Sequence, residues 1–175
     1  MPCSEPGWWG SSRPFQPGST PFEAPEAMAF RGTHHSTLDV KNRLTIPAKR
    51  RAQLTGGLVV ALQRDAPSAL AIWPADEFNA YTAEVLAGLH PLSDEYVKLE
   101  RYFNAYSEEL ELDAAGRVML PGPLLAVAGL GREVALIGAG NRLEIWNRDA
   151  WAAEHGDILQ TVRDIRPGTE NGHTA

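Results

Sequence analysis

Cysteine and long apolar runs are almost absent from this sequence of 175 residues. Its single cysteine, Cys3, excludes a disulfide within the chain and any zinc site built from cysteines. No apolar run approaches the roughly 20 residues that are needed to cross a bilayer. With 43% hydrophobic and 22% charged residues, the composition is otherwise typical of a soluble globular protein. We therefore expect a cytoplasmic protein that makes no membrane contact.

The sequence also has fewer basic than acidic residues, with 16 lysines and arginines against 22 aspartates and glutamates. The formal net charge is −6, which by itself argues against a nucleic-acid partner. The charge is uneven, however, because residues 31–52 carry +5 and the rest of the chain carries −11. Salt screens charges beyond about 10 Å, so a polyanion responds to such a local patch rather than to the net charge. The alternative is an ordinary solvated helix surface, and charge alone does not separate the two.

The first residues differ from the rest in composition. Six of the 13 prolines precede Met28, together with little periodic apolar sequence. Such a segment buries too little apolar surface to fold. We expect a disordered N-terminal extension over residues 1–28, with Met28 as the physiological start of the protein.

The most informative feature is an internal repeat. The run TLDVKNRLTIP at 37–47 returns 74 positions later as ELDAAGRVMLP at 111–121. Leucine, aspartate, arginine and proline recur at the same positions, and similar hydrophobic runs and helix starts follow both copies. We infer a tandem duplication. The expected parts are unit one over 33–76, a helical linker over 77–106, unit two over 107–150, and a C-terminal helix and polar tail over 151–175.

Each unit is predicted to contain a strand, a tight turn, a strand, a short helix, two strands and a helix. Asn42 and Gly116 occupy the same position in the turn, and both residue types tolerate a left-handed backbone. Pro47 and Pro121 suit the first helical position, where no amide donor is needed. A unit this short cannot easily bury its own apolar face, so the two units should pair into one barrel.

Helix starts and the linker complete the expected architecture. Ser93 is expected to cap the linker helix, and Asp76 and Asp149 are expected to cap the helices that follow each unit. Apolar residues recur at helical spacing along the linker, which predicts core packing or a subunit contact. These residues are Tyr96, Leu99, Phe103 and Tyr106. The fold class predicted is therefore mainly β with short helices (α+β).

The repeated Asp-x-x-x-Arg motif has two interpretations. The first is a salt bridge that closes the hairpin, and exposed pairs of this kind contribute about 0–1 kcal/mol. The second is a turn that presents an arginine, steadied by the aspartate, to a groove of DNA. Arginine suits that role because its planar fork can pair bidentately with guanine or phosphate. The basic residues around the first copy raise the weight of the second interpretation without deciding between them.

Three stretches of the chain resemble the MraZ family. They are FRGTHHSTLDVKNRLTIPAKR at 30–50, LDAAGRVMLP at 112–121 and LEIWN at 143–147. The resemblance extends over about residues 28–165 and implies two tandem SpoVT–AbrB-type units. It implies a swapped-hairpin AbrB-like barrel with pseudo-two-fold symmetry, and assembly into a homo-oligomeric ring. It further implies a nucleoid-associated, sequence-specific regulator that binds double-stranded DNA at short G-rich direct repeats. Such regulators usually repress the division and cell-wall gene cluster that includes their own gene.

Residue by residue, the resemblance assigns DNA contact to the two motifs. These residues are Asp39, Arg43, Asp113 and Arg117. Charge and proximity in the sequence add Lys41, Lys49 and Arg50. Three glutamates closely precede the second turn, whereas basic residues flank the first. On sequence grounds Arg43 should therefore matter more for DNA binding than Arg117.

Two other functions remain open. One is an antitoxin-like protein of the same fold that neutralises a partner protein, although such proteins usually carry one unit and a long C-terminal arm. The other is a structural ring that uses its turns for subunit packing. Enzymatic chemistry is not indicated, because no nucleophile–base pairing is readable. Adjacent His34 and His35 point to opposite faces of a strand, which is a poor arrangement for one metal ion, so we expect no metal site. We also expect no cofactor and no small-molecule substrate.

Overall fold

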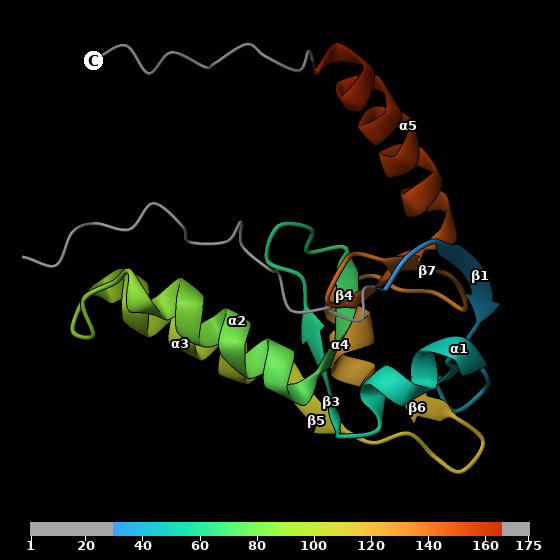
Figure 1. The fold of residues 1–175 in the computed structure, drawn as a ribbon, viewed down its shortest axis with the longest axis horizontal. Helices are drawn as coiled ribbons and strands as arrows, with labels where there is room; N and C mark the ends of the chain where they lie inside the picture. Colours follow the sequence, from blue (N-terminus) through green and yellow to red (C-terminus); the bar gives the residue numbers. More distant parts are fainter. Residues whose placement is uncertain (1–29, 166–175) are drawn as a thin grey trace, which may run out of the picture.

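The computed structural model describes residues 30–165, so the extension expected over 1–28 lies outside the described residues (Figure 1). The strands are β1 (Thr33–Thr37), β2 (Arg43–Thr45), β3 (Leu58–Leu62), β4 (Ala69–Pro74), β5 (Ser107–Leu110), β6 (Arg117–Met119), β7 (Glu133–Gly138) and β8 (Leu143–Asn147). The helices are α1 (Ala48–Arg51), the 3-10 helix η1 (Ala52–Leu54), α2 (Ala75–Ala87), α3 (Asp94–Ala105), α4 (Gly122–Val127) and α5 (Arg148–Asp164). A mixed α+β architecture with short helices is thus confirmed.

Strand pairing interleaves the two halves of the chain. Six antiparallel strands form a sheet in the order β1-β7-β8-β4-β3-β5, and β2 pairs with β6 in a separate two-stranded ribbon. The outer strand β1 pairs with β7 of the second half, while β5 pairs with β3 of the first half. Exchanging each strand for its counterpart in the other half (β1 for β5, β3 for β7, β4 for β8) gives the same strand order read in reverse. A closed barrel is not found within residues 30–165, because the six-stranded sheet ends at β1 and β5.

The main core lies between the six-stranded sheet and the β2–β6 ribbon. Alternate residues of β3, such as Leu58 and Val60, are at most 1% exposed and face this core. The ribbon contributes Leu44 and Val118, both fully buried. Helices η1 and α4 follow the ribbon strands along the chain and contribute Leu54, Leu124 and Leu125 to this core. The ribbon is thereby anchored by its inner face, which leaves its other face outward.

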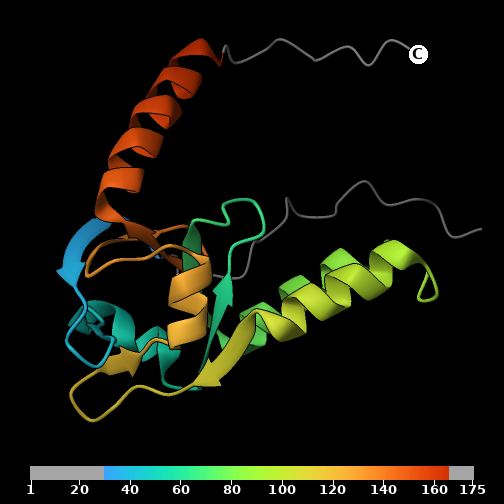
Figure 2. The same ribbon diagram turned by 180° about the vertical axis from the view of Figure 1, so that it is seen from behind.

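A second apolar cluster covers the opposite face of β3 and β4. There Val59 and Trp73 pack against helices α2 and α3, which form a hairpin that extends away from the sheet (Figures 1 and 2). Trp73 stacks on Tyr81 with ring centroids 5.0 Å apart. Phe103 of the linker is 7% exposed and belongs to this cluster, so this part of the linker stripe packs in the core.

Two of the three expected helix caps are wrong. Ser93 does cap α3, since its hydroxyl accepts a hydrogen bond from Tyr96 N at 3.2 Å. Asp76 and Asp149 instead lie in the first turns of α2 and α5, where a carboxylate still favours the helix dipole. Helix α2 begins after Pro74, and the side chain of Asn147 caps α5. The short helices also begin one residue later than expected, because the prolines at 47 and 121 take the N-cap position.

Helix α5 projects from the body of the molecule with none of its residues buried (Figure 1). Its first turns contact the sheet through Trp151, whose ring centroid lies 5.8 Å from that of Trp146. Beyond them, Ile158, Val162 and Ile165 are 38%, 59% and 64% exposed. No helix in the described part of the chain is long and apolar enough to cross a membrane.

Candidate nucleic-acid interface

The two Asp-x-x-x-Arg motifs form the same turn twice. Asp39 Oδ1 accepts hydrogen bonds from the backbone N of Lys41 at 2.8 Å and of Arg43 at 2.9 Å. In the second turn, Asp113 Oδ1 accepts from the backbone N of Ala115 and of Arg117, both at 2.9 Å. Each carboxylate thus closes its own turn through backbone donors, as expected for aspartate at this position.

Each turn also needs a left-handed residue, and the sequence provides one in both copies. Asn42 has φ 58°, and Gly116 has φ 74°. Asparagine and glycine are the residue types that adopt this backbone conformation at least cost. The expectation for these two positions is confirmed.

The second oxygen of each aspartate holds an arginine. Asp39 Oδ2 accepts from Arg43 Nε at 2.6 Å, and Asp113 Oδ2 accepts from Arg117 Nε at 2.8 Å. This contact on Nε orients the guanidinium. Arg117 Nη2 also lies 2.8 Å from Asp113 Oδ2, which leaves Nη1 as the terminal amino group of Arg117 that can donate elsewhere. The side chains of Arg43 and Arg117 are 31% and 34% exposed. The salt bridge and a role in binding are therefore compatible, because the bridge positions the donor without using all of it.

Pairing of β2 with β6 brings both arginines to one surface. In the antiparallel register, Arg43 lies opposite Met119, and Thr45 lies opposite Arg117. Residues directly opposite one another share a face of the ribbon, so all four side chains lie on the face away from the core. Leu44 and Val118 occupy the inner face and are fully buried. We call the outward face with Arg43, Thr45, Arg117 and Met119 the ribbon face.

Sequence reasoning did not include Thr45 and Met119 in the site. Met119 is 61% exposed, and Thr45 is exposed as well. The alternation of inward Leu44 and Val118 with their neighbours already indicated that these side chains face outward. What the sequence could not indicate was that the two strands pair with each other.

The other three predicted contact residues are in different environments. Lys41 is exposed in the first turn, and Lys49 is exposed on α1. Arg50 is only 8% exposed, so it does not lie on a surface that could enter a DNA groove. Proximity in the sequence suggested that Arg50 is a surface contact, but Arg50 is the one residue of α1 that is buried.

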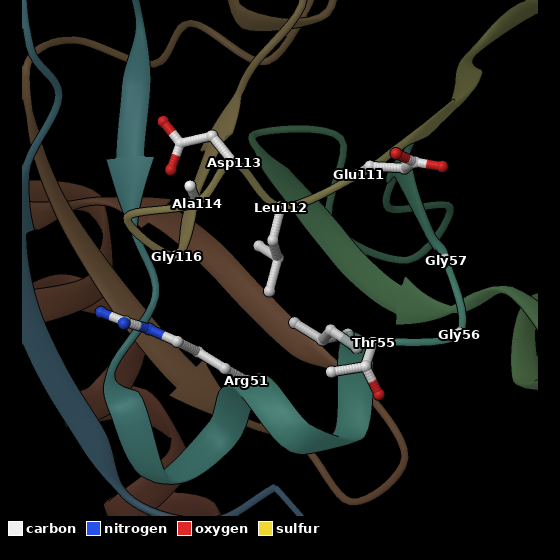
Figure 3. Close-up of a pocket in the computed structure, with 10 residues that line it drawn as sticks. Arg51, Thr55, Gly56, Gly57, Glu111, Leu112, Asp113, Ala114 and Gly116 are labelled. Atoms are coloured by element: carbon white, nitrogen blue, oxygen red, sulfur yellow. The ribbon is translucent and has the colours of Figure 1, made fainter.

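The basic helix α1 lies against the second turn rather than the first. Arg51 Nε donates to Ile46 O at 2.8 Å, and its guanidinium covers Gly116 (Figure 3). The reason is the antiparallel ribbon, in which the end of β2 meets the start of β6, and α1 follows β2. The sequence-based reason for ranking Arg43 above Arg117 is therefore weakened, because Arg51, which follows Arg43 in sequence, lies beside the second turn in space.

A cavity of about 580 Å³ separates the 54–57 segment from the strand that enters the second turn (Figure 3). The two repeats differ by two residues at this point. Gly57 is followed directly by β3, whereas Arg132 and Glu133 come between Gly131 and Val134. In that half Leu38 N donates to Arg132 O at 2.8 Å and closes the gap. Leu112, the counterpart of Leu38, instead points into the cavity (Figure 3).

The backbone of each turn lowers the pKa of its aspartate. The pKa of Asp39 falls from 3.8 to about 2, chiefly because the Arg43 amide donates a hydrogen bond to the charged carboxylate. The pKa of Asp113 is lowered for the same first cause, the amide of Arg117. Both carboxylates are therefore held in the charged form that binds the arginine.

We expect the first turn to contribute a pH-dependent part of the folding free energy. A carboxyl whose folded pKa is about 2, against 3.8 when unperturbed, stabilises the fold above about pH 4 and loses that contribution as the pH falls toward 2. NMR titration of the Asp39 carboxyl carbon should give a midpoint near 2. In Asp39→Asn, stability should fall less over the same pH range, because the amide does not titrate. A midpoint at 3.8 or above would show that the turn bonds are not maintained in solution.

Comparison with known proteins places this sequence among related chains. A family model described as "MraZ protein, putative antitoxin-like" matches residues 29–91 and 104–157. A protein of Saccharopolyspora erythraea named transcriptional regulator MraZ is 40% identical over 144 residues, which cover 79% of this chain and 98% of that protein. Proteins of the same name from Thioalkalivibrio sulfidiphilus and Corynebacterium efficiens are 35% and 43% identical, each over 70% of this chain and over 82% and 84% of their own lengths. Both repeated turns lie within the matched residues, and the chain therefore belongs to the MraZ family.

Proposed function

We propose that this protein is a transcriptional regulator that binds double-stranded DNA through the ribbon face. The observation that carries the proposal is the presence of Arg43 and Arg117 on one outward surface, each held by its own aspartate. The relatives' printed name, transcriptional regulator, supports the same role. A regulator of this kind acts by binding and needs no catalytic group.

The dimensions of the ribbon suit a groove of DNA. The major groove is about 12 Å wide and admits a two-stranded antiparallel ribbon. Three residues of β2 span roughly 10 Å, and the two arginines lie toward opposite ends of the paired strands. Each arginine keeps at least one terminal amino group that can donate to O6 or N7 of guanine. This chemistry supports a preference for short G-rich direct repeats.

The proposed target is the promoter of the division and cell-wall gene cluster, which includes the gene for this protein. The protein represses that promoter. The groove contacts are Arg43 and Arg117, positioned by Asp39 and Asp113, and the exposed Lys41 and Lys49 meet the phosphate backbone. Binding at that promoter would associate the protein with the nucleoid.

Fluorescence anisotropy with two labelled duplexes tests this proposal. One duplex carries the DNA immediately upstream of the gene, and the other is a scrambled sequence of the same composition. We expect preferential binding to the first, with an affinity for both that falls steeply as salt increases. Equal binding to both duplexes would overturn sequence specificity. Absence of binding to either would favour the antitoxin-like alternative.

We also expect the protein to assemble into a homo-oligomer, and the apolar side of α5 supports this. Trp151, Ile158 and Val162 recur at helical spacing and Ile165 follows at the C-cap, and an exposed apolar stripe favours a protein contact. Light scattering should give a mass several times 19.1 kDa, as a ring requires.

A pair of matched variants locates the contact. Val162→Glu should shift the protein toward smaller species, because it places a charge in the apolar stripe of α5. Val127→Glu on α4, at a position 54% exposed, should not. A monomer at micromolar concentration would exclude the ring, and dissociation by the α4 variant alone would place the contact elsewhere.

A further inference from the structure

A small cationic pocket lies where the start of β1 meets α1. Its volume is about 210 Å³, and it is lined by Arg31, Lys49, Arg50 and Gln53. Arg31 comes from the segment before β1, Lys49 and Arg50 come from α1, and Gln53 comes from η1. Three of the four lining residues are cationic and none is acidic. The pocket therefore has the charge that attracts an anion.

Arg50 is the most unusual member of this group. It is 8% exposed, yet its guanidinium makes no hydrogen bond or ion pair within residues 30–165. A buried arginine is ordinarily paired, because an uncompensated charge away from water is costly. Since Arg50 lines the pocket, an anion bound there would supply the missing partner.

Gln53 is the fourth residue that lines the pocket, and it carries no charge that would offset the three cations. A phosphate group fits this lining, since its negative oxygens accept hydrogen bonds from arginine and lysine donors.

The backbone beside the pocket is already in place. Gly32 has φ 82°, and the chain there passes over Arg50, whose Nη2 would lie 3.8 Å from a Cβ at Gly32. Gly138 N donates to Gly32 O at 2.9 Å, and Phe30 N donates to Gly140 O at 2.6 Å. These bonds hold the Arg31 segment on both sides. A ligand would therefore enter a formed pocket, which reduces the entropy cost of binding.

We infer that this pocket binds one phosphate group. The inference rests on the proposed function in one respect, because it assigns that phosphate to the DNA backbone that flanks the groove occupied by the ribbon. Lys49 follows Thr45 by four residues, so the two lie at most about 14 Å apart, which keeps the pocket near the strand that is proposed to enter the groove. Such a contact sets the register of the protein on DNA without reading sequence.

The first arm of the test uses inorganic phosphate. Thermal unfolding of the full chain is compared in sodium phosphate and in sodium chloride at equal pH and ionic strength. Phosphate should raise the Tm of the wild type more than that of Arg31→Gln or Arg50→Met, which keep only the general stabilising effect of phosphate as an excluded salt. Arg31 is exposed, so its variant should fold even if the buried substitution does not. Lys98→Gln, which removes one charge from α3 on the opposite side of the molecule, should keep the shift (Figure 1).

The second arm uses DNA. Arg31→Gln and Lys49→Gln should each weaken binding to the promoter duplex and to the scrambled duplex by the same factor, about tenfold. Each should also reduce the slope of log K against log salt by about one, as expected when one phosphate contact is lost. Lys98→Gln should leave both the affinity and the slope unchanged.

The outcomes separate the pocket from the proposed function. Duplex binding by Arg31→Gln with an unchanged slope, together with no phosphate-specific rise in Tm, would overturn the pocket and leave the proposed function intact, because Arg31 is not among its contacts. A rise in Tm without any duplex binding would overturn the proposed function and make a free phosphate compound the ligand of the pocket. A rise in Tm with duplex binding but an unchanged slope would overturn the assignment to the DNA backbone.

Discussion

Arg43→Ala is expected to abolish preferential binding to the promoter duplex while leaving fold and assembly intact, and Arg117→Ala is expected to do the same. The fold should survive because each ion pair is exposed, and such pairs contribute about 0–1 kcal/mol. The aspartates also keep their backbone hydrogen bonds in both variants. A bidentate base contact contributes about 1–3 kcal/mol of discrimination, and in an oligomer the loss recurs at every repeat.

The comparison between the two arginines tests the structure against sequence reasoning. Sequence context favours a larger effect at Arg43. In the structure both arginines share the ribbon face with similar exposure, and α1 lies beside the second turn. We therefore expect losses of similar size, measured by anisotropy with promoter and scrambled duplexes.

Lysine substitutions provide the matched control for charge. Arg43→Lys keeps the positive charge but lacks the planar fork, so it should retain binding to the scrambled duplex and lose the preference for the promoter. If Arg43→Ala and Arg117→Ala both bind the promoter duplex as the wild type does, the turns are structural and the ribbon face is not the DNA-binding surface.

Gly116→Ala should be the most destabilising single-methyl change in the turns. At φ 74° an alanine is strained by about 1–2 kcal/mol, and its Cβ would overlap the guanidinium of Arg51. Displacing Arg51 would also break its hydrogen bond to Ile46 O, at a cost of about 0.5–1.5 kcal/mol. Urea unfolding should therefore show a loss of about 1.5–3.5 kcal/mol in the free energy of unfolding.

Gly140→Ala separates strain from overlap. Gly140 has φ 76° and nothing within 4 Å of a Cβ, so this variant should show only the strain. In an Arg51→Ala background, the cost of Gly116→Ala should fall to that of Gly140→Ala. Equal costs for the two glycines in the wild-type background would show that Arg51 does not pack on the second turn in solution.

Features that depend on neighbouring residues were predictable from the sequence. The turn bonds of Asp39 and Asp113 join residues at most four positions apart, and the left-handed backbone at Asn42 and Gly116 follows from residue type. The repeat itself also predicted two equivalent copies of the turn. The caps of α2 and α5 were missed because Pro74 and Asn147 compete with the aspartates two residues later. A shift of two residues at the start of a helix is not resolved by propensity.

Features that depend on pairing between distant segments were decided by the tertiary structure. The β2–β6 register joins strands 74 positions apart, and it alone places Arg43 and Arg117 on the same face. The same pairing brings α1 to the second turn, and the packing of α1 against the start of β1 buries Arg50. The sequence by itself determined which residues bear charge and how each turn is closed. It could not determine which charges meet, because strand register is set by burial of a shared core rather than by local sequence.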